Sequence, residues 1–223
     1  MHIYIFIAAF VVFCPPVCYI KIMLDVKTIN KPNELNLTEL HSISHLLWGT
    51  RSMPATHFRI GFISGDAFYI EMICEEQNPL RNYTRHRDPV YRDSAMEAFF
   101  LFAPSGGDME TYLNFEMNAN GALLAAYGPS RMYRSYFTPE EYRLFRAKAW
   151  IQDNKWGISF RIPICILEKI YGPLTLEKGS HFFCNFYKIS ENAETEHYGA
   201  YAPIDSPVPS FHMPEYFEEA VLV

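Results

Sequence analysis

The chain has 223 residues, of which 49% are hydrophobic and 20% are charged, so it has enough apolar material for one well-buried core or at most two small ones. This composition excludes an intrinsically disordered chain. The formal net charge is -6, from 19 Lys and Arg against 25 Asp and Glu. Because no broad basic face is available for a phosphate backbone, we expect no nucleic-acid partner.

The N-terminus carries an apolar run, MHIYIFIAAFVVF. It is long enough for the core of a signal peptide and too short to span a hydrocarbon layer of about 30 Å, and Pro15, Pro16 and Lys21 interrupt any longer membrane helix. We therefore expect no transmembrane span. Residues 1–18 are interpreted as a signal peptide or an extension, and residues 19–223 as the folded domain. This reading slightly favours secretion or display at the cell surface.

Five cysteines form an odd set. Cys14 and Cys18 lack the CxxC spacing of zinc and redox sites, whereas Cys74, Cys165 and Cys184 lie inside apolar runs. We expect these last three to be buried free thiols.

The first half of the domain shows the two-residue alternation of β-strands. Residues 58–62 and 67–73 predict a hairpin that turns at Gly65–Asp66. Residues 77–92 are polar and contain two prolines, so they predict a long loop, and long loops on a rigid sheet often carry binding sites.

Three further strands are predicted at residues 96–102, 111–118 and 122–127, with Asn120–Gly121 as a hairpin turn between the last two. The strand over 111–118 has one apolar face and one polar face. The polar face consists of Tyr112, Asn114, Glu116 and Asn118.

The second half continues the pattern. A second hairpin is predicted from residues 143–150 and 156–162, and a later strand from 181–189. Short helices are predicted at the following segments: 39–47, 139–145 and 164–170. Strands therefore dominate, and the chain is predicted to form one all-β domain, an antiparallel β-sandwich with a few short helices.

Some residues invite catalytic or metal chemistry. His41 and His45 have the spacing of two metal ligands on a helix, but no catalytic Glu lies between them, so ordinary packing is favoured. Asp93, Glu97 and Glu116 suggest the acid and nucleophile of a glycosidase. Such carboxylates equally serve as hydroxyl acceptors, calcium ligands or partners of arginine, so the sequence leaves this open.

A sugar-binding site needs flat aromatic rings for the apolar C–H faces of the sugar and polar groups for its hydroxyls. Tyr91 and Phe211 supply such rings, and Glu97, Asn114 and Glu116 supply polar groups.

Several segments taken together resemble carbohydrate-binding module family nine. They are PVYRDSAMEAFF (89–100), YLNFEMNANG (112–121), WGISFRIP (156–163), NFYK (185–188) and FHMPEYF (211–217). The resemblance implies a jelly-roll or DOMON-like β-sandwich that binds glycans without cleaving them. Xylanase-borne members are attached to a catalytic domain and hold cellulose or xylan chains, which links the family to polysaccharide catabolism.

The resemblance also implies site residues. The two stacking positions fall on Tyr91 and Phe211, both tryptophan in the xylanase-borne members, so the stacking area is smaller here. The hydroxyl-binding positions, with looser matches toward the end, fall on Glu97, Asn114, Glu116, Asn185 and Tyr187, with Arg131 and His212 as neighbours.

The expected partner is an oligosaccharide or polysaccharide, with a separate glycoside hydrolase as a second candidate. We expect no enzymatic activity and no cofactor apart from a structural calcium ion, which the family can hold and whose ligands the sequence does not identify. Three alternatives stay open: a haem-binding or electron-transfer DOMON-type domain, a glycosidase, and a structural sandwich that binds a protein partner.

Overall fold

A computed structural model describes residues 23–102 and 110–223. The predictions for the N-terminal segment 1–18, for Cys14 and for Cys18 lie outside the described residues. No helix in the described part of the chain is long and apolar enough to cross a membrane.

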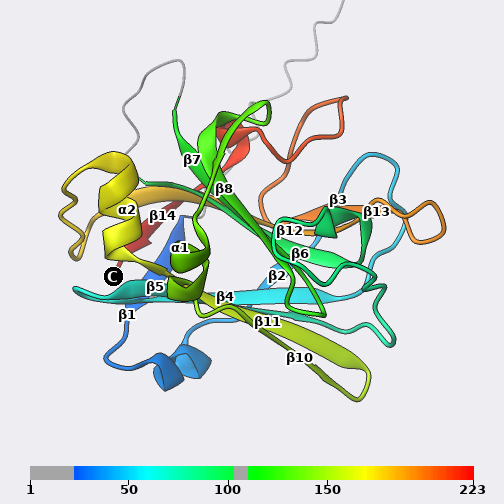
Figure 1. Cartoon of the computed structure of the whole chain (residues 1–223), viewed down its shortest axis with the longest axis horizontal. Coiled ribbons are helices and arrows are strands. Elements are labelled where there is room, and N and C mark those ends of the chain that lie inside the picture. The colour runs from blue at the N-terminus through cyan, green and yellow to red at the C-terminus, as the bar shows by residue number, and fades with distance from the viewer. Residues whose placement is uncertain (1–22, 103–109) are drawn as a thin grey trace, which may run out of the picture.

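Two β-sheets pack face to face (Figure 1). The first, which we call the site sheet, has the spatial order β14 (Glu218–Leu222), β12 (His181–Ser190), β6 (Ala95–Phe102), β7 (Tyr112–Asn118), β8 (Leu123–Ser130) and β9 (Tyr133–Tyr136), with β13 (His197–Ala200) and β3 (His45–Leu46) beside β12. The second, the back sheet, contains β10 (Lys148–Gln152), β11 (Lys155–Pro163), β5 (Ala67–Cys74) and β4 (Thr56–Ile63), with β2 (His41–Ile43) beside β4. The predicted all-β sandwich is confirmed.

Strand β1 (Leu24–Thr28) joins the two sheets along one edge. Its first half pairs with β14 and its second half with β4, both in parallel. The other strand pairings of the described residues are antiparallel. The prediction of a purely antiparallel sandwich is therefore wrong at this strand, because parallel neighbours need a long crossover connection, which alternation along a single strand does not reveal.

The core between the sheets is rich in phenylalanine because every second residue of each strand points inward. The rings of Phe58 on β4 and Phe186 on β12 stack with centroids 3.6 Å apart, which ties the back sheet to the site sheet. The predicted first hairpin is confirmed, since Ile60 of β4 pairs with Ile70 of β5.

Two of the three predicted helices are present. Helix α1 (Pro139–Leu144) starts with a capping box, in which Thr138 and Glu141 each bond the other's backbone N–H. Helix α2 (Ile164–Tyr171) follows Pro163. Three short 3-10 helices also occur: η1 (Pro32–Leu37), η2 (Val90–Arg92) and η3 (Pro214–Tyr216).

The helix predicted over 39–47 is wrong. This segment forms β2 and β3, which pair with β4 and β13. Edge pairing and the burial of Ile43 outweigh a helical spacing that is too short to be stable alone. His41 and His45 therefore do not share a helix face, and His41 stacks on Phe58 with ring centroids 5.2 Å apart.

The second predicted hairpin forms, but its first strand begins only at Lys148, because α1 and a turn at Arg146 occupy the residues before it. Cys74 and Cys184 are buried free thiols, as predicted. Cys165 is exposed, contrary to the prediction, because it lies on the outer side of α2, whose buried residues are Ile166 and Leu167.

The outer face of the site sheet carries a second apolar cluster. It includes Phe99, Tyr112, Tyr187, Phe211 and Phe217. The segment between β13 and β14 supplies the last two of these and covers part of this face. The site sheet is thus covered on one side by the back sheet and on the other by this segment, and the uncovered remainder forms a pocket.

Candidate functional site

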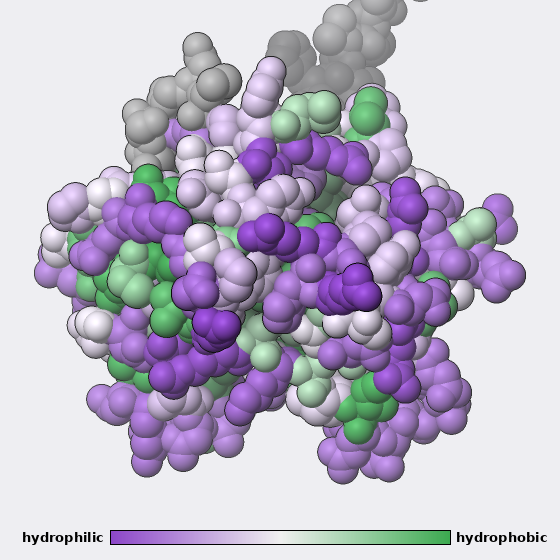
Figure 2. Space-filling model, in the orientation of Figure 1, coloured by the Kyte–Doolittle hydropathy of each residue, from purple (hydrophilic) through white to green (hydrophobic). Residues whose placement is uncertain are grey.

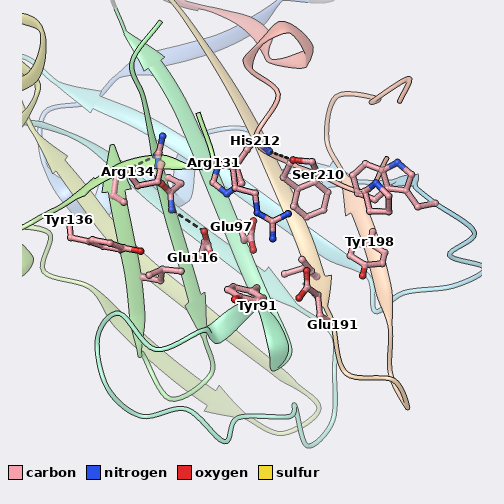
Figure 3. A pocket seen from close by; sticks show the side chains of 17 residues that line it. Tyr91, Glu97, Glu116, Arg131, Arg134, Tyr136, Glu191, Tyr198, Ser210 and His212 are labelled. Atoms are coloured by element: carbon pink, nitrogen blue, oxygen red, sulfur yellow. Dashed lines mark hydrogen bonds between the residues drawn. The ribbon is translucent and has the colours of Figure 1, made fainter. Parts of the chain in front are cut away.

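A pocket of about 260 Å³ opens on the outer face of the site sheet. Figure 3 shows Glu97 and Glu116 near its centre, with Tyr91, Tyr136, Tyr198 and the two arginines around them. Its lining includes seven of the nine residues predicted from the sequence, namely Tyr91, Glu97, Asn114, Glu116, Arg131, Phe211 and His212.

Glu97 and Glu116 form the floor of the pocket. They lie directly opposite each other on the neighbouring strands β6 and β7, so both side chains point to the same face. Their exposed fractions are only 3% and 4%. The expected apolar inner face of β7 is present, and the polar outer face is buried as well. The sheet register therefore places two carboxylates side by side under the opening.

Internal contacts satisfy these carboxylates incompletely. Oε1 of Glu116 accepts a hydrogen bond of 2.9 Å from Nδ2 of Asn114, whereas Oε2 is buried and has no partner among the described residues. The carboxylate of Glu97 makes no hydrogen bond within the described part of the chain. A buried polar atom without a partner costs free energy, so the floor of the pocket is suited to a ligand that brings donors.

Burial raises the pKa of both carboxyl groups. The pKa of Glu116 rises to about 8, because burial outweighs the stabilising effects of the Asn114 hydrogen bond and of the nearby Arg134. The pKa of Glu97 is also raised well above its usual value, first by burial and then by the charges of Glu116 and Glu191. Two like charges this close resist simultaneous ionisation, so near neutral pH the pair holds a proton.

Arg134 braces this floor from β9. Its guanidinium donates to Oδ1 of Asn114 and to the carbonyl of Gly128, at 2.7 Å in the latter case. It lies over the ring of Tyr112, 4.2 Å from the centroid, and its buried Nε has no partner among the described residues. Arg131, by contrast, is exposed at the rim. Arg134 thus orients Asn114 and hence the carboxylate of Glu116.

The aromatic walls differ from the expectation. Tyr91 is half-buried on η2 and lines the pocket. Phe211 also touches it, but it is only 5% exposed and its ring is stacked on Tyr187 at 4.0 Å. Trp48 packs against Phe211 with centroids 5.4 Å apart, and Tyr198 packs against Trp48 at the same separation. On this side of the pocket, the rings that a ligand can contact are therefore mainly those of Trp48 and Tyr198, because Phe211 is covered.

Asn185 and Tyr187 are not brought into the pocket lining. Nδ2 of Asn185 donates to the carbonyl oxygens of Ala202 and Tyr216, and its Oδ1 accepts from the backbone N–H of Ala202. These bonds hold the segment that covers the sheet. Tyr187 supports Phe211 from below. Both residues shape the pocket without facing it.

His212 lines the pocket and is bonded to Tyr112, with 2.8 Å between Nδ1 and the phenolic oxygen. Burial, with the nearby arginines, lowers the pKa of His212 to about 3, so the ring is neutral at physiological pH. Burial also raises the pKa of Tyr112 to about 12.

Asp93, the third carboxylate of the glycosidase hypothesis, lies outside the pocket lining. It is fully buried and accepts hydrogen bonds from the backbone N–H groups of Asn82 and Tyr83 and from Nδ2 of Asn118. Asp93 therefore anchors the long loop. Within the described residues no group of three or more His, Cys, Asp and Glu side chains is arranged to hold a metal ion.

Sequence reasoning did not assign the remaining lining residues a role in the site. They include Trp48, Arg134, Tyr136, Glu191 and Tyr198. Trp48 and Tyr198 come from segments near β3 and β13, which pair with each other across a long sequence separation. No local motif marks them, and neither residue lies in a predicted strand.

Comparisons with known proteins identify a family and proteins of similar fold. A model of carbohydrate-binding family 9 matches residues 30–222. A solved putative carbohydrate-binding protein from Bacteroides uniformis ATCC 8492 is similar in fold, with a TM-score of 0.76 and 23% identity over 90% of this chain and 99% of that chain.

Two structures of a carbohydrate-binding module family 9 from Caldicellulosiruptor kristjanssonii, one in complex with glucose and one with cellotriose, have TM-scores of 0.64 and 0.59. Each is 11% identical and covers 90% of this chain, with 95% and 93% of the other chain covered. A search of curated proteins finds no match. The family match extends over most of the chain, and the chain therefore belongs to carbohydrate-binding family 9.

Proposed function

We propose that the pocket binds a sugar unit of a cellulose- or xylan-type glycan and that the protein binds this glycan without cleaving it. The observation that carries the proposal is the pair of buried, incompletely hydrogen-bonded carboxylates of Glu97 and Glu116 at the floor of an aromatic-walled pocket. Sugar hydroxyls are donors of the kind that such acceptors lack.

The walls fit the rest of a sugar ring. Tyr91 on one side, with Trp48 and Tyr198 on the other, provides apolar surface for the C–H faces of the ring. Phe211 acts from behind Trp48 as a support in this proposal, instead of as a stacking ring. Arg131 and Ser210 at the opening are additional donors for hydroxyl or ring oxygens.

The proposed ligand class agrees with the glucose and cellotriose in the two family 9 module structures of similar fold. A role alongside a glycoside hydrolase belongs to the same proposal, because a binding module that concentrates a hydrolase on its polymer needs no catalytic groups of its own. Calcium is a second component to test, since the family resemblance implies that these modules can hold it.

The experiment is a calorimetric titration with cello- and xylo-oligosaccharides, with and without calcium. We expect Tyr91→Ala to weaken binding by about 1–3 kcal/mol, because it removes an aromatic contact with the sugar. Tyr133→Ala is the matched control, since Tyr133 is 72% exposed and lies outside the pocket lining. Absence of binding to any neutral oligosaccharide, or unchanged affinity in a folded Tyr91→Ala variant, would contradict the proposal.

A further inference from the structure

A second hollow, which we call the basic hollow, lies beside α1 and is separate from the sugar pocket. Its polar lining consists of His86, Arg87, Tyr142, Arg143 and Arg146, and no carboxylate is among the lining residues. The face that carries α1 and β8 is mostly hydrophilic in Figure 2. Three arginines and a histidine thus converge in a chain whose formal net charge is -6.

Arg87 is held in place without a carboxylate partner among the described residues. Its guanidinium donates to the carbonyl of Phe137 and lies over the rings of Tyr136 and Tyr142, 5.5 and 5.8 Å from their centroids. These contacts fix the guanidinium and leave its charge without a counterion. The hydroxyl group of Tyr142 also interacts with this guanidinium, so the partners of Arg87 among the described residues are neutral groups.

Arg146 and Arg143 are exposed. Arg146 makes no ion pair within the described residues, and Arg143 is paired only with Glu140, at 3.4 Å, in a contact where both side chains are about three-quarters exposed. Such a pair contributes little and is easily exchanged for another anion. Both guanidinium groups are therefore available to a ligand.

His86 adds a donor of defined position. The backbone N–H of Leu123 donates to its Nδ1 at 3.2 Å, which places the proton of the neutral ring on Nε2. The ring also stacks on Tyr142, with centroids 5.0 Å apart. The hollow thus combines one oriented imidazole donor with three guanidinium groups, which suits the planar oxygens of a carboxylate or the oxygens of a sulfate.

The basic hollow is linked to the sugar pocket through a single side chain. Tyr136 lines the pocket, and Arg87 lies over the ring of Tyr136. A glycan that continued from the pocket past Tyr136 would therefore approach Arg87. We propose that the basic hollow binds an anionic substituent, a uronate carboxylate or a sulfate ester, on the same glycan whose neutral sugar occupies the pocket. This inference rests on the proposed function of that pocket.

The test compares oligosaccharides of one backbone and one length: neutral xylohexaose, the same chain with a glucuronate branch, and the same chain with a sulfate ester. Titrations use the full-length protein as wild type and as the double variant Arg143→Gln/Arg146→Gln. We expect at least one anionic ligand to bind about tenfold more tightly than xylohexaose. The double variant should remove this advantage while keeping the affinity for xylohexaose, which also shows that it is folded.

Two controls sharpen the result. Lys155→Gln/Lys178→Gln removes the same charge from exposed positions outside the hollow and should keep the advantage. Arg143→Lys/Arg146→Lys keeps the charge but loses the planar fork, so it should retain only part of the advantage. The advantage should also shrink as sodium chloride is raised, because exposed charges are screened.

The ligand that gains affinity identifies the anion as uronate or sulfate. Equal binding of neutral and anionic ligands, or an advantage that survives the double variant, would overturn the inference and leave the proposed sugar site intact. If the wild-type protein binds none of the three ligands and does not bind cellohexaose either, both the inference and the proposed function are overturned.

Discussion

Two of the polar clusters buried in the described part of the chain are completed in opposite ways. The first is the pocket floor, where Oε2 of the buried Glu116 has no hydrogen-bond partner among the described residues, Oε1 has only Asn114, and Glu97 is buried beside it. The second lies between the sheets, where the buried Lys188 donates to Oγ of Ser94 at 2.6 Å and to Nε2 of His197 at 2.9 Å. Both clusters use strands of the site sheet, so burial alone does not separate a binding site from a structural contact.

The polar groups around Lys188 find their hydrogen-bond and ion-pair partners within their own cluster. Glu76 lies 3.8 Å from the Lys188 ammonium and accepts hydrogen bonds from Ser94 and from Nε1 of Trp156. These contacts lower the pKa of Glu76, although its burial acts in the other direction. Burial lowers the pKa of His197 to about 4, so this ring is a neutral acceptor for the lysine. A fully paired network holds the fold, whereas an unpaired one is available to a ligand.

The largest effect is expected at Lys188. Lys188→Ala should lower the free energy of unfolding by about 3–5 kcal/mol, because it leaves Glu76 partly buried without its cation. Denaturant unfolding measures this. Lys178→Ala, an exposed control, should change little. The double variant Lys188→Met/Glu76→Gln should lose less than Lys188→Ala; an equal or larger loss would show that the charge pairing is not what stabilises this cluster.

The second effect concerns binding. Glu97→Gln should weaken glycan binding by about 2 kcal/mol, because a neutral amide is a poorer acceptor for hydroxyl donors than a carboxylate. Its free energy of unfolding should not fall, since no internal hydrogen bond is lost. Calorimetry and denaturant unfolding test the two halves of this prediction, with Glu194→Gln as the exposed control. If Glu97→Gln lowered the free energy of unfolding and left glycan affinity unchanged, Glu97 would be a structural residue and not a ligand-binding one.

The third effect is a pH dependence of the free energy of unfolding, set by Glu116. Its pKa is raised to about 8 in the folded state, so ionising it as pH rises above the usual value near 4.5 costs stability until the folded pKa is passed. Glu116→Gln should therefore unfold like the wild type at pH 4.5 and be more stable than it by a few kcal/mol at pH 9, because a pKa raised from 4.5 to about 8 costs roughly 1.4 kcal/mol for each pH unit between the two values. Glycan affinity of the wild type should rise over the same range, because hydroxyl donors favour the ionised carboxylate. If Glu116→Gln were more stable than the wild type by the same amount at pH 4.5 and pH 9, the ionisation of Glu116 would not be the cause.

Much of the architecture is readable from residue order. The alternation along 58–73 and 112–127 predicts both hairpins and places Glu116 on the polar face of its strand, and the turn at Asn120–Gly121 then fixes the pairing of β7 with β8. The family resemblance adds Tyr91 and Glu97, and both line the pocket. The strands and the turn follow from local sequence patterns. The two site residues follow from segments that match the family in the same order along the chain.

The other walls of the pocket depend on contacts between residues that are distant in the chain. Trp48 and Tyr198 reach the pocket because β3 pairs with β13, and Phe211 is turned from a wall into a support because Tyr187 and Trp48 pack on it. Long-range pairing and side-chain packing have no period along the chain, so no local pattern records them. Residue order alone therefore predicts most of the strands and the two carboxylates. The packing between distant strands decided which rings and charges surround those carboxylates and which of them were left without a partner.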